Sequence, residues 1–271
     1  MRILTGFPMR AAALQSFPDC VATMPITNLQ NESRELAARK LGVADWQIVA
    51  TFDRVRPISG LAMIGGNFTG SARWRIRLWP DTARALTPYD SGWQYLKPLI
   101  GFGEFPWGEA LGQTLYDDFH VQIAAASFQS FPTAVMQIDL TDPTNPDGFH
   151  QISTLFADDY LSFDPEFGLS LTPYTDSKQA RTQGGSLRAD RGAFWRGLQG
   201  DMKLIPEAER SALFDLMRRH DLSLDFFISI YPQWGGKLER DNQMQAKFTR
   251  LASLSHDIAT RHSSQFAIEE T

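Results

Sequence analysis

The sequence predicts a mainly β protein with two domains: a β-sandwich, then a smaller β-sandwich with one packed helix. Segments of alternating apolar and polar residues recur through the first half, most clearly over residues 73–79. Aromatic residues make up 12% of the chain, which suits the inner faces of sandwiches. Strong helical patterning occurs once, near residues 206–220.

The first 45 residues carry no clear period. Proline and asparagine interrupt them, so we expect short strands and turns, with a brief helical turn over residues 35–41. Cys20 is the one cysteine of the chain, which rules out an internal disulfide and a cysteine-based zinc site. Its apolar neighbours indicate a small buried hydrophobic residue rather than a nucleophile.

A period of two begins at Trp46. Residues 47–52 and 58–64 are predicted strands, and the Gly-Gly-Asn turn at 65–67 follows them because these residues tolerate positive φ. The next strand, residues 73–79, places Trp74, Ile76 and Leu78 on one face and Arg73, Arg75 and Arg77 on the other. The apolar face belongs to the core.

Two interpretations remain for the arginine face. The guanidinium groups lie over neighbouring aromatic rings or pair with acids on the next strand. Alternatively, Arg73, Arg75 and Arg77 form a contact between subunits, since arginine is enriched at interfaces.

Residues 80–118 are rich in proline, glycine and aromatic residues, which is typical of a functional loop. Tyr89, Trp93, Trp107 and Tyr116 could stack on sugar rings, or they could form an apolar lid or a protein interface.

Strands are predicted again at residues 119–124 and 134–140. The turn that follows presents Asp142, Asn145 and Asp147, whose oxygens form a weak calcium candidate. The prolines of this segment build a tight turn without any metal. We place the domain boundary here, giving domains 1–148 and 149–271.

The second half begins with a predicted strand at residues 152–160. A polar loop around residues 182–185 separates two further strand candidates. The helix over about 206–220 begins at a proline, has acids in its first turn and ends on cations, as the helix dipole favours. Strands at 224–230, 245–251 and 265–268 complete the domain.

Several function classes find no support in the sequence. A net charge of −5 argues against direct nucleic-acid binding. No stretch reaches 18 apolar residues, so we expect no transmembrane segment and a product of the cytoplasm. No catalytic motif or cofactor signature is present, so we expect a protein that is not an enzyme and needs no cofactor.

Weak catalytic and metal candidates exist. Asp158 or Glu166 could serve a hydrolase acting on surface polysaccharide, although adjacent acids on a strand point to opposite faces. His256 and His262 have poor spacing for metal ligands.

The buried strand at 58–64 ends in the Gly-Gly-Asn turn at 65–67, and the Arg-x-Arg-x strand at 73–79 follows. The segment Tyr-Asp-Ser-Gly-Trp at 89–93 and the turn Asp-Pro-Thr-Asn-Pro-Asp-Gly at 142–148 come later in the chain. Through these segments, residues 45–160 resemble tail-tip proteins of long-tailed, siphovirus-like bacteriophages.

The resemblance implies a galactose-binding-like jelly roll, similar to carbohydrate-binding modules, followed by a tail-tube-like domain. It implies a structural component of a phage tail tip or baseplate, assembled in the host cytoplasm. Its partners would be distal tail, hub, tube or tape-measure proteins, in a homo-oligomeric ring. The alternative function is a glycan-binding module for host attachment, with Tyr89, Trp93 and Trp107 as its platforms.

Overall fold

A computed structural model describes residues 1–31, 33–86, 88–97, 119, 121–163, 169–232, 234, 236–258 and 261–271. The chain forms two compact units, Met1–Ser162 with Phe226–Met244, and Phe163–Asp225 with Gln245–Thr271. Both units consist mainly of antiparallel strands, which confirms the predicted fold class.

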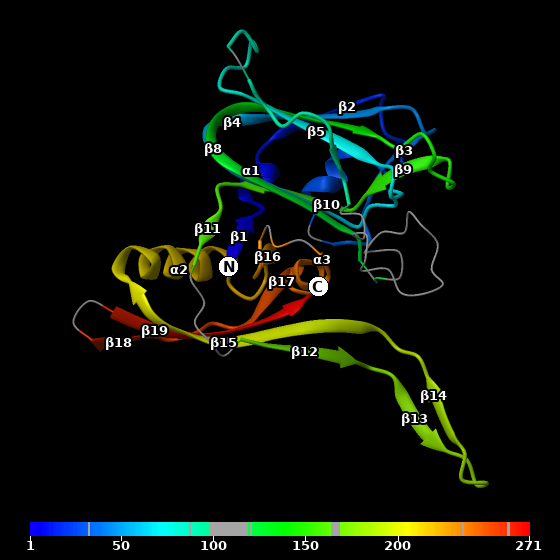
Figure 1. Cartoon of the computed structure of the whole chain (residues 1–271), viewed down its shortest axis with the longest axis vertical. Helices are drawn as coiled ribbons and strands as arrows, with labels where there is room; N and C mark the ends of the chain where they lie inside the picture. Colours follow the sequence, from blue (N-terminus) through cyan, green and yellow to red (C-terminus); the bar gives the residue numbers. More distant parts are fainter. Residues whose placement is uncertain are drawn as a thin grey trace. The chain divides into compact units, whose positions relative to one another are not determined.

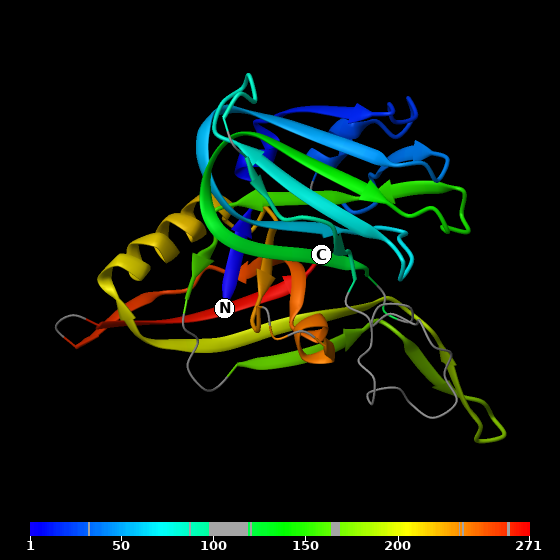
Figure 2. The same ribbon diagram turned by 45° about the horizontal axis from the view of Figure 1, so that its top comes forward.

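The first unit contains most of the strands (Figures 1 and 2). Its strands are β1 (Arg2–Thr5), β2 (Ala13–Phe17), β3 (Ala38–Leu41), β4 (Trp46–Ile64), β5 (Arg73–Trp79), β6 (Tyr89–Asp90), β7 (Gln94–Tyr95), β8 (Ile123–Thr141), β9 (Phe149–Ile152), β10 (Thr154–Asp158), β11 (Leu161–Ser162) and β16 (Phe226–Ser229). Its helices are α1 (Phe7–Arg10), the 3-10 helix η1 (Ile26–Gln30) and α3 (Gly236–Asp241).

The main sheet of this unit runs in the order β10-β4-β8-β5-β6, with β2 on β4 and β7 on β5. β2 pairs with the first part of β4, and β10 pairs with its last part. The sheet therefore has two halves that share the long strands β4 and β8.

The two halves are joined where β4 and β8 bend together (Figure 1). The register shifts between Thr51 and Arg56, and Pro57 lies directly opposite Pro132 at this point. Bulges and prolines mark places where a strand turns a sandwich corner, because they interrupt the ladder. The expectation of separate strands at 47–52 and 58–64, and at 119–124 and 134–140, was wrong: polar residues at the bend break the alternation but not the strand.

Apolar side chains from both halves meet in one core. Ile48 and Ile138 come from the first half of the sheet, and Leu61 and Leu155 from the second, all at most 1% exposed. Trp46 closes this core and is fully buried. The apolar face of β5 joins the same core, as its alternation predicts.

The N-terminal segment is more ordered than expected. Residues 35–41 do not form a helical turn, because Ala38–Leu41 is strand β3, paired antiparallel with β9. The sequence pattern did not predict this strand, because its pairing partner lies more than a hundred residues away. β1 pairs with β11 and β16.

The second unit contains one long helix, a set of paired strands in one sheet and a separate two-stranded sheet of β13 and β14. Its elements are β12 (Ser170–Thr175), β13 (Lys178–Arg181), β14 (Leu187–Asp190), β15 (Phe194–Pro206), α2 (Glu207–His220), β17 (Gln243–Arg250, of which residues 245–250 belong here), β18 (Leu254–Ile258) and β19 (Arg261–Glu270). β15 lies between β12 and β19, while β17 and β18 pair with opposite ends of β19. Helix α2 lies where the sequence predicts it and buries Leu213, Leu216 and Met217.

This division differs from the expected boundary at residues 148–149. β9 and β10 follow that point in the chain, yet they pair with β3 and β4 inside the first unit. No helix in the described part of the chain is long and apolar enough to cross a membrane.

Candidate functional site

A groove of about 510 Å³ lies against the first half of the main sheet. We call it the polar groove. It is lined by Phe17, Pro18, Asp45, Trp46, Gln47, Arg75, Arg77, Trp93 and Asp139. The polar members of β4, β5 and β8 alternate with core residues, so the strand period places them on the face opposite the core.

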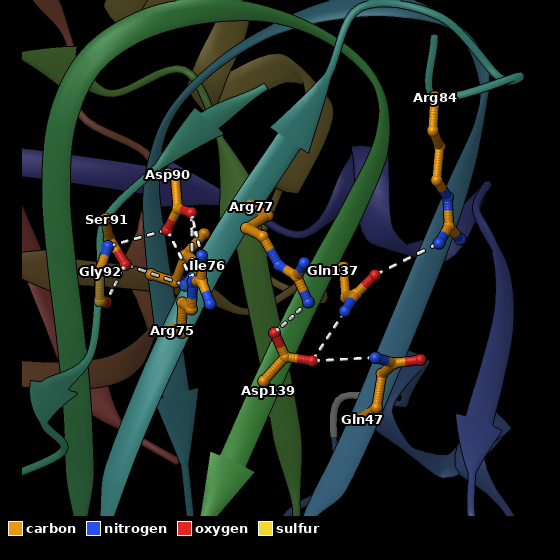
Figure 3. A network of polar contacts seen from close by, with 10 residues as sticks. All are labelled: Gln47, Arg75, Ile76, Arg77, Arg84, Asp90, Ser91, Gly92, Gln137 and Asp139. Atoms are coloured by element: carbon orange, nitrogen blue, oxygen red, sulfur yellow. Dashed lines mark hydrogen bonds and ion pairs between the residues drawn. The ribbon is translucent and has the colours of Figure 1, made fainter. Parts of the chain in front are cut away.

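Two arginines of β5 are held by acids of neighbouring strands (Figure 3). Arg77 Nη2 lies 2.7 Å from Asp139 Oδ2 on β8, and Arg75 Nε donates to Asp90 Oδ1 on β6 at 2.9 Å. The pairs join β5 to the strands on either side of it.

Asp139 is the centre of this network (Figure 3). Its Oδ1 accepts hydrogen bonds from Gln47 Nε2 at 2.9 Å and Gln137 Nε2 at 2.7 Å. Gln137 in turn accepts from Arg84 Nη1 at 3.2 Å. Because each group is held by its neighbours, the network presents planar donors and acceptors in fixed positions.

Asp90 remains ionised over a wide range of pH. The hydrogen bond from Arg75 and the backbone N–H of Gly92 lower the pKa of Asp90 to about 2, against the opposing effect of desolvation. The same hydrogen bond raises the pKa of Arg75. This ion pair therefore stays charged at neutral pH.

Trp93 is positioned by the loop that follows β6. Ser91 Oγ accepts from Ile76 N at 2.9 Å, and Ser91 N donates to Ile76 O at 3.0 Å. These bonds fasten the loop to β5. Trp93 is 46% exposed and lines the polar groove, as does Phe17, which is 52% exposed.

The structure brings together Trp93, Arg75 and Arg77, which the sequence assigned to two separate sites. Tyr89 does not join them, because its ring stacks on Phe128 with centroids 4.8 Å apart. Arg73 is also outside the groove and hydrogen-bonds Tyr95 Oη at 3.1 Å. Trp107, Tyr116 and Glu166 lie outside the described residues.

The arginine face is paired within its own chain, as the first of the two sequence interpretations predicted. Arg75 and Arg77 each have a carboxylate partner, and Arg73 lies over the Tyr95 ring. These contacts account for the arginine face without a contact between subunits. The subunit contact stays a prediction that Arg75→Glu and a test of assembly can address.

Sequence reasoning missed the partners of the groove arginines. Gln47 and Asp139 stand between apolar residues on β4 and β8, and that alternation marks them as facing outward. Only the register shows that Gln47 lies opposite Asp139 on β8, and that Asp139 in turn lies opposite Arg75 on β5. No pattern in the sequence around Phe17, at the end of β2, indicated that it lines a groove.

The calcium candidate forms a network of protein hydrogen bonds. Asp142 is fully buried and accepts from Thr69 N at 2.8 Å and from Thr69 Oγ1 at 2.6 Å. Asn145 Oδ1 accepts from Asp147 N at 3.0 Å, and Asp147 Oδ2 accepts from Asn67 Nδ2 at 2.8 Å. These oxygens anchor the turn to the neighbouring Asn67 turn.

The other titratable candidates also have structural surroundings. Asp158 is a partly buried acceptor for Thr5 Oγ1, away from the groove. The rings of His256 and His262 lie 4.6 Å apart, and His262 Nε2 is 2.6 Å from Glu207 Oε2. Among described residues, no group of three or more His, Cys, Asp or Glu side chains could hold a metal ion.

Comparison with known proteins gives only distant structural likenesses. No family model matches the chain, and no curated protein matches it. The similar solved structures include carbohydrate-binding and lectin modules. The resemblance to phage tail-tip proteins finds no support among these comparisons.

Three of these structures illustrate the level of likeness. A family 32 CBM of Clostridium perfringens NanJ, in complex with galactose, is 10% identical, with 59% of this chain and 99% of that chain covered and a TM-score of 0.39. A chitosan-binding module of a Paenibacillus chitosanase/glucanase is 10% identical over 54% of this chain and 94% of that one, with a TM-score of 0.36. The lectin domain of lectinolysin, complexed with Lewis B antigen, is 8% identical over 55% of this chain and 94% of that one, with a TM-score of 0.37. At this level of similarity the function of these proteins cannot be transferred to this chain. A function has to be argued from the residues of the chain itself.

Proposed function

We propose that the first unit binds carbohydrate in the polar groove, as a binding module rather than an enzyme. The observation that carries this is the combination of two exposed aromatic rings, Trp93 and Phe17, with the Arg77–Asp139–Gln47 network in one groove. Aromatic faces pack on the C–H face of a sugar ring, while planar polar groups hydrogen-bond its hydroxyls. A volume of about 510 Å³ is in the range of small-molecule sites.

The charge balance of the groove favours a neutral sugar. Arg75 is paired with Asp90 and Arg77 with Asp139, so the cations leave little field to attract an anionic ligand. Asp139 accepts from three side chains, so its oxygens are held in fixed positions from which they can accept a hydrogen bond from a ligand hydroxyl.

A glycan array followed by titration calorimetry tests this proposal. We expect the purified chain to bind a neutral glycan and Trp93→Ala to weaken binding about tenfold or more, since a stacked ring contributes on the order of 1 kcal/mol or more. The matched control is Trp234→Ala, which removes another exposed tryptophan of the first unit that does not line the groove. No binding on the array, or equal effects of the two variants, would contradict the proposal.

A second candidate function is assembly into a phage tail tip, as the sequence resemblance implies. The observation that favours it is the hairpin of β13 and β14, which extends beyond the paired strands β12 and β15 (Figures 1 and 2). Every residue of both strands is exposed. An isolated two-stranded hairpin is marginally stable in water, so a partner is expected to support it.

The charge of this hairpin suits another copy of the chain. Residues 178–191 carry four cationic side chains and one carboxylate, whereas the whole chain has a net charge of −5. We propose that the hairpin contacts a neighbouring copy in a ring at the virion tail tip. Light scattering should show an oligomer that the double change Arg181→Glu and Arg188→Glu dissociates, whereas Arg218→Glu on α2 should not. Antibody label found in lysates but never on tail tips would reject this second function.

A further inference from the structure

We infer that the carbohydrate site continues past Phe17 into a second groove and accepts an oligosaccharide rather than a single sugar. This inference rests on the proposed carbohydrate binding of the polar groove. It adds a subsite, a ligand size and a distinct role for Phe17.

The second groove has a volume of about 490 Å³ and lies along β2 and the segment after it. We call it the apolar groove. Its floor includes Leu14, Cys20 and Ile26, which also pack against the core of the first unit. Burial raises the pKa of the Cys20 thiol, so this floor carries no charge at neutral pH. The core contacts make the groove a preformed depression.

Phe17 is the residue that lines both grooves. Its ring is 52% exposed at the end of β2. Each groove alone is large enough for a small ligand, since such sites measure about 300–1,000 Å³. A ligand that fills both must cross this ring, which offers a stacking surface between the two grooves.

Hydrogen bonds fix the backbone on both sides of Phe17. Ser16 Oγ accepts from Trp46 Nε1 at 2.8 Å and donates to Pro18 O at 2.6 Å. Cys20 Sγ lies 3.4 Å from the same hydroxyl. Ser16 lines the apolar groove and Trp46 the polar groove, so one buried hydrogen bond ties the two floors together. Phe17 thus forms a fixed ridge between the two grooves, and this lowers the entropic cost of binding an oligosaccharide across it.

The two grooves differ in what they can recognise. The polar groove contains the Arg77–Asp139–Gln47 network, which can distinguish hydroxyl positions. The apolar groove has Gln15 and Asp19 as exposed polar side chains beside its apolar floor. The hydrogen-bonded network therefore selects the sugar in the polar groove, whereas the apolar groove, named after its floor, adds contacts to the next rings of the oligosaccharide.

The dependence of affinity on chain length tests this inference. The probes are gluco-, galacto- and chito-oligosaccharides of one to six units, arrayed and then titrated in solution. For the series of oligosaccharides that binds, we expect affinity to rise about tenfold between one and four sugar units, because further sugar rings become buried.

Two variants assign that gain to the apolar groove. Ala22→Trp places a bulky ring in this groove from an exposed position, and Phe17→Ala removes the shared ridge. Both should abolish the rise with length, and Ala22→Trp should leave single-unit affinity within about twofold. The matched control Ala44→Trp, at an exposed alanine that lines neither groove, should keep the rise.

The outcomes separate this inference from the function it rests on. Binding that Trp93→Ala weakens but that does not depend on chain length, or a rise that survives Ala22→Trp, overturns the extended site and leaves the polar groove intact. Absence of binding at every length in all three oligosaccharide series overturns both the extended site and the proposed carbohydrate binding.

Discussion

Arg77 and Asp139 form a diagonal ion pair between the neighbouring strands β5 and β8, with 2.7 Å between Nη2 and Oδ2. Both side chains are partly shielded from solvent, at 27% and 14% exposed. The pair is therefore a fixed part of the polar groove and also contributes to the sheet.

The first prediction concerns the coupling of this pair. In a double-mutant cycle of Arg77→Ala and Asp139→Ala, we expect a coupling free energy of about 1 kcal/mol. Either single substitution already breaks the partly buried, charge-assisted hydrogen bond, so the second substitution does not lose it again. Urea denaturation measures it. The Arg56–Asp53 pair, in which the Asp53 side chain is 50% exposed, is the control and should show a smaller, more salt-sensitive coupling. Equal coupling in the two pairs would contradict the fixed geometry of the groove.

The second prediction concerns the buried pair Arg196–Glu270 in the second unit. Arg196 Nε and Nη2 each donate to a Glu270 oxygen at 2.8 Å, and both side chains are at most 4% exposed. Glu270→Gln should lower the free energy of unfolding of this unit by about 3–5 kcal/mol, since it removes the charge of a carboxylate that is bonded twice to a buried cation. Hydrogen exchange of β15 and β19 reports on this unit. The exposed control Glu269→Gln, one residue away, should have little effect; a similar loss in both variants would rule out the pair as the cause.

The third prediction concerns the pH dependence set by Asp158. Desolvation raises the pKa of Asp158 from 3.8 to about 6, while Thr5 Oγ1 and Asp159 N donate hydrogen bonds to its carboxylate. The folded state therefore binds more protons than the unfolded state between these two values. The contribution of Asp158 to stability is complete below about pH 4 and is lost as pH rises through about 6, by at most about 3 kcal/mol.

Asp158→Asn isolates this contribution. The variant should be more stable than the wild type at pH 7.5, and the difference should shrink towards pH 4.5, because asparagine carries no charge at either pH. Denaturation curves at the two pH values measure the difference. Asp159→Asn serves as the neighbouring control. A constant difference between Asp158→Asn and wild type across the range would show that Asp158 does not titrate in this window.

The fourth prediction concerns the contact of Gly60 with Tyr160. A Cβ at Gly60 would lie 2.0 Å from Tyr160 Cε2, and the ring cannot move freely because Tyr160 Oη donates to Ala126 O at 3.3 Å. Gly60→Ala should destabilise the first unit by about 1–3 kcal/mol through this overlap. Thermal unfolding measures it, with Gly184→Ala as control, where the nearest atom is 4.0 Å away. Tyr160→Ala in the Gly60→Ala background should remove the overlap; if the alanine costs as much there, the overlap is not the reason.

The sequence anticipated local features of the fold well. The alternation of residues 73–79 fixed which side of β5 is buried, and the proline, acid and cation pattern located α2. It could not show that β4 and β8 continue through their polar bend, because Asp53–Arg56 break the alternation at a place where the ladder shifts register. It also could not find β3, whose partner β9 is remote in sequence.

The candidate site was only partly accessible from the sequence. Trp93, Arg75 and Arg77 were identified as residue types suited to binding, but they were assigned to different sites. Asp139, Gln47 and Phe17 join them through the register of β4 with β8 and β2, which depends on long-range pairing.

The sequence by itself determined the β character, the faces of the regular strands and the position of the long helix, because these follow from short-range periodicity and capping. Tertiary structure alone decided that Arg75 and Arg77 are paired with Asp90 and Asp139, and that Trp93 and Phe17 share a groove with these two arginines. The physical reason is that charge pairing and groove formation depend on which strands become neighbours. That choice is made by burying one common core from segments far apart in the chain.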